Sequence, residues 1–323
     1  MLVVMVTGLA VASLLVVLLA RRSKAARPKL SPDILARAAE APCPSPADAP
    51  FIDVSWTGIA GIRLELCGGS PPSTLLVDPY LTRHSLPELF FPVDADSPTL
   101  ARAFPRADFI VVGHTHHDHF ADTPEIAKRT GATILGSRST CNLAVAMGVA
   151  PAQCIAFEDQ NPVQAGPWTI EAIPTPHALV WPGFVPFSGD VPPRPRDDRP
   201  WVWQLREGQM WSLIIRGAGK TLYHHGSAGL SDSQLRRVRG LQPDLAFVGI
   251  ALRENTPDFE ARLLEPLRAK SVMPVHHDNF FGPMLTDEGP LLSRINLPEF
   301  ESRIGQYGAH LLVRKPFERV RVQ

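Results

Sequence analysis

The hydrophobic residues of this chain fall into short runs that glycine, proline and polar residues separate. Runs of about four to eight apolar, β-branched residues are typical of buried strands. The strands predicted in this way cover residues 64–66, 73–78, 107–113, 132–136, 168–174, 210–216, 220–224, 245–250 and 271–275. Residues 210–216 and 220–224 pair as a hairpin across Gly217-Ala218-Gly219. Helices are predicted over 141–147 and 259–269, and another begins near Pro124, just after Asp122.

The start of the chain has a different pattern. Residues 2–20 carry no charged side chain, and a helix of that length spans about 28 Å, close to the thickness of a bilayer core. Five basic residues and no acid follow, at Arg21, Arg22, Lys24, Arg27 and Lys29. The apolar run predicts a single-pass transmembrane helix over residues 1–22 in the inner (plasma) membrane. The basic residues that follow it predict that the rest of the chain lies in the cytoplasm. The alternative is a signal peptide and a secreted or periplasmic domain.

Residues 23–50 are rich in proline and alanine, including Ala41-Pro42-Cys43-Pro44-Ser45-Pro46. We expect them to be a linker. Residues 51–323 would then form the folded domain. That length suits one large domain or two small ones.

Composition narrows the class of protein. The 323 residues are 45% hydrophobic and 20% charged, and the formal net charge is zero, so the basic footprint of a nucleic-acid-binding protein is missing. The four cysteines, Cys43, Cys67, Cys141 and Cys154, show no CxxC spacing. Neither a disulfide framework nor a cysteine metal site is therefore predicted. We expect buried thiols in a reducing compartment.

Histidines gather at four places along the chain, each directly after a predicted strand. Four histidines and an aspartate lie between His114 and His119. The other places are His177, His224-His225 and His276-His277, so that only His84 and His310 lie elsewhere. Neutral imidazole is the commonest protein ligand for zinc-like metals, and carboxylate completes such sites. The pattern therefore predicts a metal centre at strand ends, where α/β sheets commonly place their sites.

The motif His114-x-His116-x-Asp118-His119, followed by strand-end histidines, resembles the signature of metallo-β-lactamase-fold hydrolases. Residues 53–58 and Leu75-Leu76-Val77-Asp78-Pro79-Tyr80 resemble the opening strands of one branch. That branch includes ascorbate-phosphate-lactonase-like proteins and N-acylphosphatidylethanolamine phospholipases D. The resemblance covers roughly residues 51–315. It implies an α+β fold, a four-layer αβ/βα sandwich of two mixed sheets.

The resemblance also implies a ligand set for one or two Zn²⁺ ions, with Mn²⁺ or Fe²⁺ as alternatives. One ion would take His114, His116 and His177. The second would take Asp118, His119 and His276. Asp78 would orient a histidine from beneath the loop. An activated water would be the nucleophile, and Asp118 would be a catalytic residue. His277 and Asp278 would either support the ligands or donate a proton to the leaving group.

One departure from the family pattern concerns the turn Gly226-Ser227-Ala228-Gly229. The family has an aspartate that bridges the two metals where this chain has Ser227, whose neutral hydroxyl is a poor ligand. Three consequences remain open. His225 would replace the aspartate as a ligand, or the second site would be weak with Asp118 as general base, or the site would be inactive.

The segment 178–209 is a long proline-rich loop with five large aromatic residues. A loop of this length is commonly a lid or a binding loop. Its aromatics would line an apolar substrate channel or pack on the sheet edge, and Phe280-Phe281 would wall the same pocket or belong to the core.

Together these features predict a membrane-anchored hydrolase of a phosphodiester, a lactone or a related ester. The substrate would be a small molecule or a lipid. The alternatives are a non-hydrolytic metal-binding sensor or assembly protein, and a redox di-iron protein. The substrate, the native metal and the oligomeric state stay open.

Overall fold

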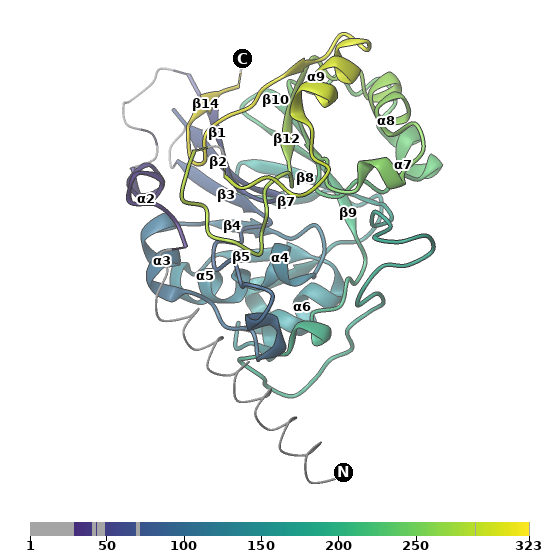
Figure 1. The fold of residues 1–323 in the computed structure, drawn as a ribbon. Helices are drawn as coiled ribbons and strands as arrows, with labels where there is room; N and C mark the ends of the chain where they lie inside the picture. Colours follow the sequence, from purple (N-terminus) through teal and green to yellow (C-terminus); the bar gives the residue numbers. More distant parts are fainter. Residues whose placement is uncertain (1–28, 41–42, 44–48, 69–71, 288, 323) are drawn as a thin grey trace, which may run out of the picture.

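Two seven-stranded mixed sheets organise the computed structural model, which describes residues 29–40, 43, 49–68, 72–287 and 289–322 (Figure 1). The first sheet has the order β14-β1-β2-β3-β4-β5-β6. From β14 to β3 the neighbours are antiparallel, and from β3 to β6 they are parallel. The strands are β1 (Phe51–Gly58), β2 (Gly61–Cys67), β3 (Ser73–Val77), β4 (Phe109–Val111), β5 (Thr133–Gly136), β6 (Cys154–Ala156) and β14 (Val320–Arg321).

The second sheet has the order β13-β12-β11-β10-β9-β8-β7 and the same division into parallel and antiparallel halves. Strands β13 to β10 are parallel, and β10 to β7 are antiparallel. The strands are β7 (Val163–Ala165), β8 (Trp168–Pro174), β9 (Trp211–Gly217), β10 (Lys220–His225), β11 (Leu245–Gly249), β12 (Ser271–Val275) and β13 (His310–Leu311).

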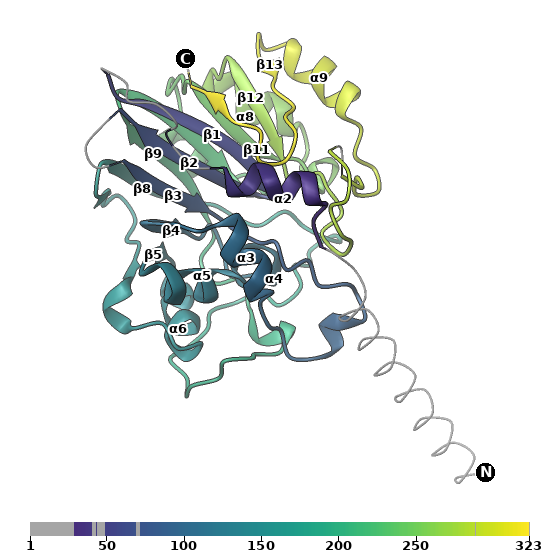
Figure 2. The same ribbon diagram turned by 90° about the vertical axis from the view of Figure 1, so that its left-hand side faces the viewer.

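Helices cover the outer face of each sheet, which makes four layers (Figures 1 and 2). The first sheet carries α2 (Pro32–Ala39), α3 (Ser97–Ala103), α4 (His117–Phe120), α5 (Thr123–Thr130) and α6 (Arg138–Ala146). The second carries α7 (Asp232–Arg237), α8 (Phe259–Leu267) and α9 (Leu297–Gly305). Single 3₁₀ turns are η1 (Glu88–Phe90), η2 (Pro151–Gln153), η3 (Val202–Gln204) and η4 (Arg253–Asn255). The predicted four-layer sandwich is confirmed.

Alternation along the strands explains the layers. Leu75 and Val77 of β3 lie in the core between the two sheets, while Leu76 lies in the core under the helices. In β9, Leu213 and Ile215 face the other sheet and Ile214 faces the outer helices. Because successive side chains of a strand point to opposite faces, an uninterrupted apolar run is buried on both sides.

The prediction of a linker over residues 23–50 is wrong for residues 32–39. These residues form α2, and Ile34, Leu35 and Ala38 pack into the core beneath the first sheet's helices. Ser31 caps the helix by accepting a hydrogen bond from the backbone N–H of Ile34 at 3.2 Å, and Pro32 occupies the first turn. Proline and alanine suit a helix start and a helix body as well as a linker, so composition alone did not separate the two.

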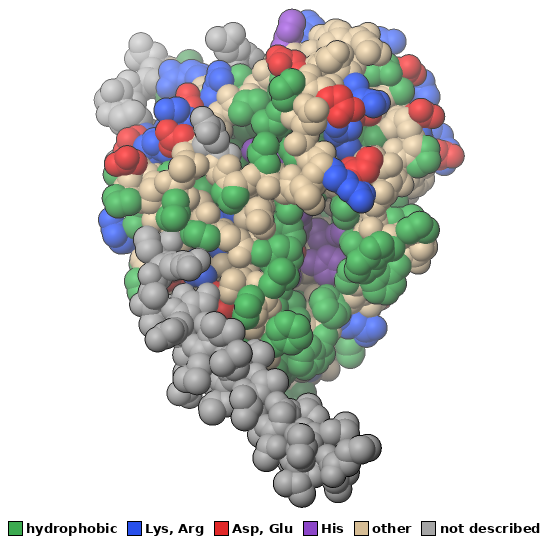
Figure 3. Space-filling view, viewed as in Figure 1, with side chains coloured by type: hydrophobic (Ala, Val, Ile, Leu, Met, Phe, Trp, Pro, Cys, Tyr) green, Lys and Arg blue, Asp and Glu red, His purple; other side chains and the backbone are tan. Residues whose placement is uncertain are grey.

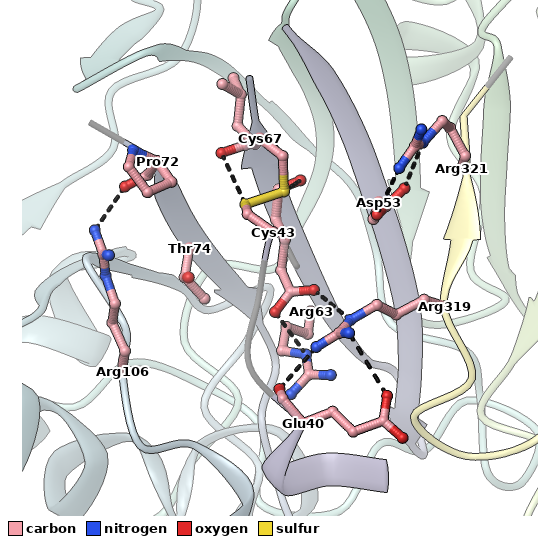
Figure 4. Close-up of a disulfide and its surroundings, with 12 residues drawn as sticks. Glu40, Cys43, Asp53, Arg63, Cys67, Pro72, Thr74, Arg106, Arg319 and Arg321 are labelled. Atoms are coloured by element: carbon pink, nitrogen blue, oxygen red, sulfur yellow. Dashed lines mark hydrogen bonds and ion pairs between the residues drawn. A yellow bond between two sulfur atoms is a disulfide. The ribbon is translucent and has the colours of Figure 1, made fainter. Parts of the chain in front are cut away.

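The expectation of four free thiols is also wrong. Cys43 and Cys67 form one disulfide, and Cys141 and Cys154 form another. The first ties the segment after α2 to the end of β2, near the ion pair of Arg319 with Glu40 (Figure 4). Arg319 also pairs with Glu65 of β2. The second ties α6 to β6. Each pair is brought together by packing between elements, which spacing in the sequence does not reveal.

The predicted anchor, residues 1–22, lies outside the described residues. Among the residues that are described, no helix has the length and apolar character needed to cross a membrane.

Candidate metal centre

The ends of three strands, β4, β8 and β12, meet at one edge of the sandwich and bring the sequence-predicted ligands together. His114 and His116 follow β4, and Asp118 and His119 lie on the short helix α4 that comes next. His177 follows β8, and His276 follows β12 in the other sheet. The backbone N–H of Trp211 donates to Gly113 O at 2.9 Å, which joins the two sheets directly beside this loop.

The first ligand group consists of His114, His116 and His177. Their ligand atoms lie within 4.8 Å of one another, and each pair of rings has its centroids 4.8 or 4.9 Å apart. His177 Nδ1 lies 2.6 Å from the carbonyl oxygen of Ala178, so Nδ1 donates and Nε2 is left to face the group. Three imidazoles in this arrangement suit a zinc-like ion.

The second ligand group consists of Asp118, His119 and His276, whose ligand atoms also lie within 4.8 Å of one another. Asp118 Oδ2 is 3.2 Å from His276 Nε2 and 3.7 Å from His119 Nε2. The rings of His114 and His119 have centroids 3.9 Å apart, so the two groups adjoin. Both groups match the sets that the resemblance implied.

Asp78 holds this arrangement from beneath. Its Oδ2 accepts a hydrogen bond from His119 Nδ1 at 2.8 Å, and its Oδ1 accepts the backbone N–H of Gly113 at 2.6 Å. The first bond orients His119 with Nε2 toward the second group. Asp78 has a φ of +44°, a left-handed conformation that aspartate tolerates better than most residues.

Burial and neighbouring charges set the ionisation of these groups. Burial, together with the other histidines, holds the pKa of His114 well below its usual value and lowers the pKa of His116 to about 3 and that of His177 to about 4. Burial alone would raise the pKa of Asp118, but His119 and His276 outweigh it and hold that pKa well below its usual range. Neutral imidazoles and an ionised carboxylate are the forms that bind metals.

The unpaired atoms of the site fit a metal. Both ring nitrogens of His114, and Nε2 of His116, are buried without a hydrogen-bond partner among the described residues. A buried polar atom without a partner costs free energy, so native proteins rarely leave one. A divalent ion bound by these nitrogens would satisfy them.

His225 and Ser227 do not join either ligand group. His225 Nδ1 lies 2.8 Å from Ser212 Oγ, and its ring stacks with those of Tyr223 and Phe259 in the core outside the second sheet. Strand alternation therefore turns His225 away from the metal groups, so of the three consequences left open for Ser227, the one in which His225 becomes a ligand is wrong. Ser227 borders the cavity described below, and its Oγ accepts the backbone N–H of Ala178 at 3.1 Å.

His277 and Asp278 contact residues of the folded core and do not line the cavity. The ring of His277 stacks on Trp56 with centroids 4.5 Å apart and does not line the cavity, so the prediction of a proton donor at His277 is wrong. Asp278 forms a fully buried ion pair with Arg83 at 2.8 Å. Arg83 also donates to the carbonyl oxygens of Asn279 and Gly282. Sequence reasoning missed Arg83, because an arginine after a strand carries no signal of its distant partner.

A cavity of about 540 Å³ opens above the two ligand groups. His116, Asp118, His177 and His276 lie at its floor, and its walls are predominantly apolar. Figure 3 shows histidines at the bottom of a hollow that hydrophobic side chains surround. The walls come from η1, the loop 178–209, the two residues before η4 and the segment after β12; they include Leu89, Phe90, Phe187, Trp203, Leu252 and Phe280. Of the five large aromatics of the long loop, Phe187 and Trp203 line this cavity, one of the two arrangements that the sequence left open, whereas Trp181, Phe184 and Trp201 do not.

His117, to which the sequence assigned no role, also lines this cavity. Its ring packs between Tyr80 and Phe281, and among the described residues its Nε2 has no hydrogen-bond partner.

Comparison with known proteins agrees with this geometry. A family profile described as "Beta-lactamase superfamily domain" matches residues 73–277, which is more than half of the chain. The chain belongs to the beta-lactamase superfamily. A superfamily relative, the UPF0173 metal-dependent hydrolase of Staphylococcus carnosus (strain TM300), is 28% identical over 232 residues, 70% of this chain and 86% of the relative.

Solved structures place this beta-lactamase superfamily member in the same fold. Igni18, a metallo hydrolase from Ignicoccus hospitalis KIN4/I, is 21% identical with a TM-score of 0.57, over 84% of this chain and 99% of that one. The metallo-beta-lactamase fold protein YhfI from Bacillus subtilis is 15% identical with a TM-score of 0.53 and the same coverage. At these identities the likeness concerns the fold alone.

Proposed function

We propose that the protein is a metal-dependent hydrolase that cleaves a phosphodiester, a lactone or a related ester in an apolar or amphiphilic substrate. One observation carries the proposal. Two adjoining groups of three metal-ligand side chains form the floor of an apolar cavity of about 540 Å³. Similarity to proteins described as metal-dependent hydrolases supports the reaction class.

The residues of the chain would divide the work as follows. His114, His116 and His177 would hold one ion, and Asp118, His119 and His276 the other. Zn²⁺ suits these nitrogen-rich sets best, with Mn²⁺ and Fe²⁺ as alternatives. When bound, the ions would supply an activated water and a Lewis acid for the scissile bond. Asp118 stays ionised, so it can also accept a proton from the attacking water.

The cavity walls argue for the substrate class. Lysine and arginine are missing from the described residues that line the cavity, and its one carboxylate is the ligand Asp118. A substrate with several negative charges would find no partner on these walls. A neutral or singly charged bond next to an aliphatic or aromatic group would bury its apolar part against Leu89, Phe187 and Phe280.

We further propose that residues 1–22 hold the protein at the inner membrane and that the folded domain faces an oxidising compartment. The basic residues from Arg21 to Lys29 favour the opposite side, by the positive-inside rule. The two disulfides favour the oxidising side, because reducing cytosols keep thiols free. We give the disulfides more weight, because all four cysteines are paired.

Metal analysis of the purified full-length chain tests the ligand assignment. We expect one to two ions per chain, and the double substitution His116→Ala with His177→Ala should remove at least one. His310→Ala is the matched control, because His310 is exposed on β13. Unchanged metal content in the double variant would overturn the assignment.

A substrate series tests the reaction. The rate of hydrolysis is measured for short- and long-chain nitrophenyl esters, for lactones and for a bis-aryl phosphodiester. The comparison shows which of the three bond types the protein cleaves. For the bond that is cleaved, each added methylene should lower KM about fourfold until the cavity is full, since burying one CH₂ contributes about 0.8 kcal/mol. Asp118→Asn should abolish turnover. Full metal content without any turnover would favour the alternative of a metal-binding sensor or assembly protein.

A further inference from the structure

Six aromatic side chains of η1 and the loop 178–209 face solvent, and three of them line the metal-centre cavity. We name Phe90, Trp181, Phe184, Phe187, Trp201 and Trp203 the aromatic rim. Their exposed fractions run from 36% for Trp201 to 70% for Phe90. In the described part of the chain they account for every Trp and Phe that is strongly exposed, whereas Trp56, Trp168 and Trp211 are buried. Exposed apolar patches of this kind mark an interaction site.

The rim is continuous with the cavity. Phe90, Phe187 and Trp203 are both exposed and part of the cavity wall. Trp201 stacks on Trp203 with ring centroids 4.7 Å apart, and Trp181 contacts Phe184 at 5.5 Å. Phe187 and Trp203 also border a second hollow, where Arg206 donates to the carbonyl oxygens of Ser188 and Asp190. Tryptophan is enriched where proteins meet the membrane–water interface.

The chain itself indicates what covers the rim. The described residues begin at Lys29, whose Nζ donates to Glu88 of η1 at 3.2 Å and to Arg83 O at 3.1 Å, and η1 ends at Phe90 of the rim. Only eight residues, 21–28, separate Lys29 from the uncharged run 2–20. Eight extended residues reach about 30 Å at most. A run that enters a bilayer would therefore keep the rim close to the surface of that bilayer.

We propose that the aromatic rim docks on the lipid bilayer and opens the metal-centre cavity directly to it, so that an amphiphilic substrate enters from the membrane. The entry of a substrate rests on the proposed function, while the docking itself rests on the rim and the position of Lys29. The basic residues between Arg21 and Lys29 would add contacts with anionic headgroups.

Tryptophan quenching tests the docking without any turnover. The full-length chain is reconstituted in vesicles of phosphatidylcholine with a minority of phosphatidylglycerol, in which the phosphatidylcholine acyl chains carry bromine. Residues 1–28 contain no tryptophan, so the signal comes from the folded domain. We expect bromine to quench a substantial share of the fluorescence. The double substitution Trp181→Gln with Trp201→Gln should remove at least half of that quenching.

A matched control is Val145→Gln with Ile155→Gln, two exposed apolar side chains outside the rim, which should leave the quenching unchanged. Metal content checks that each variant is folded, because Trp181 and Trp201 do not line the cavity. No quenching of the wild type, or equal quenching in the rim variant, would overturn the docking. Self-association of an unquenched chain would assign the rim to a second copy instead. Quenching of the wild type without any hydrolysis in the substrate series would support the docking and would contradict only the proposed hydrolase activity.

Discussion

At the scale of single residues, Ser227 distinguishes this metal centre from the pattern that its motif resembles. Its hydroxyl accepts a hydrogen bond from the backbone N–H of Ala178. His225 lies on the face of β10 that points away from the ligand groups. Each ligand group therefore consists of three side chains, and among the described residues no carboxylate belongs to both groups. A carboxylate at this position would add negative charge between the two groups.

We therefore expect Ser227→Asp to tighten the more weakly held ion about 10- to 100-fold, by analogy with the cost of losing supporting ligands. Competition with a chelator of known affinity measures the change. Ser227→Ala is the control, since it removes the hydrogen bond to Ala178 and adds no ligand. Equal affinities in all three proteins would show that this turn does not reach the ions.

His84 gives a prediction about pH. Burial, and secondarily the nearby His117, lowers the pKa of His84 to about 4 from an unfolded value near 6.5. Between these values the unfolded chain binds one proton more, so stability rises with pH from about 4 to 6.5. In metal-free protein, His84→Gln should make this rise shallower by up to about 1.4 kcal/mol per pH unit. Urea unfolding at several pH values measures it, and an unchanged slope would contradict the lowered pKa.

At the scale of elements, the site depends on loops that follow strands of two different sheets. The segments after β3 and β12 are joined by the buried Arg83–Asp278 pair, and Asp278 Oδ1 also accepts the backbone N–H of Ile59 at 2.8 Å. The backbone N–H of His276 donates to Ile59 O at 2.6 Å. These bonds place His276 opposite the loop that carries Asp118.

Arg83→Met should therefore destabilise the fold by about 3–5 kcal/mol, because it leaves the charge of Asp278 buried and unpaired. Adding Asp278→Asn should recover part of that loss. Arg303→Met is the control, since Arg303 pairs with Glu299 on the surface and such pairs contribute at most about 1 kcal/mol. Urea unfolding ranks the three. A double variant no more stable than Arg83→Met would mean that the pair does not act through charge.

At the scale of the whole molecule, the proposed membrane orientation sets two disulfides against the basic residues between Arg21 and Lys29, because these two features favour opposite sides. A disulfide restricts the unfolded chain, and loops closed over separations of 24 and 13 residues imply about 3 kcal/mol for each bond. Stability would therefore depend on the compartment.

If the domain faces an oxidising compartment, the cysteines of protein taken from intact cells should resist alkylation until a reductant is added. Mass spectrometry counts the alkyl groups. Replacing either pair by serine should cost about 3 kcal/mol in non-reducing urea unfolding. Immediate alkylation of all four thiols in protein from cells would place the domain in the cytoplasm, as the positive residues alone predict.

The sequence by itself determined the features that neighbouring residues encode. Apolar runs predicted most strands, and the His114–His119 motif with its later strand-end histidines indicated the ligand sets and the superfamily. Such signals are local: strand periodicity, a turn and a motif all lie within a few residues of one another.

Only the tertiary structure decided the rest. The face of β10 that carries His225, the stacking of His277 on Trp56 and the pairing of Cys43 with Cys67 depend on register and on packing between distant elements. Composition suggested a linker where α2 packs into the core. The cavity arises from four segments that are far apart in the sequence, because a concave surface is a property of how layers meet and not of any one element.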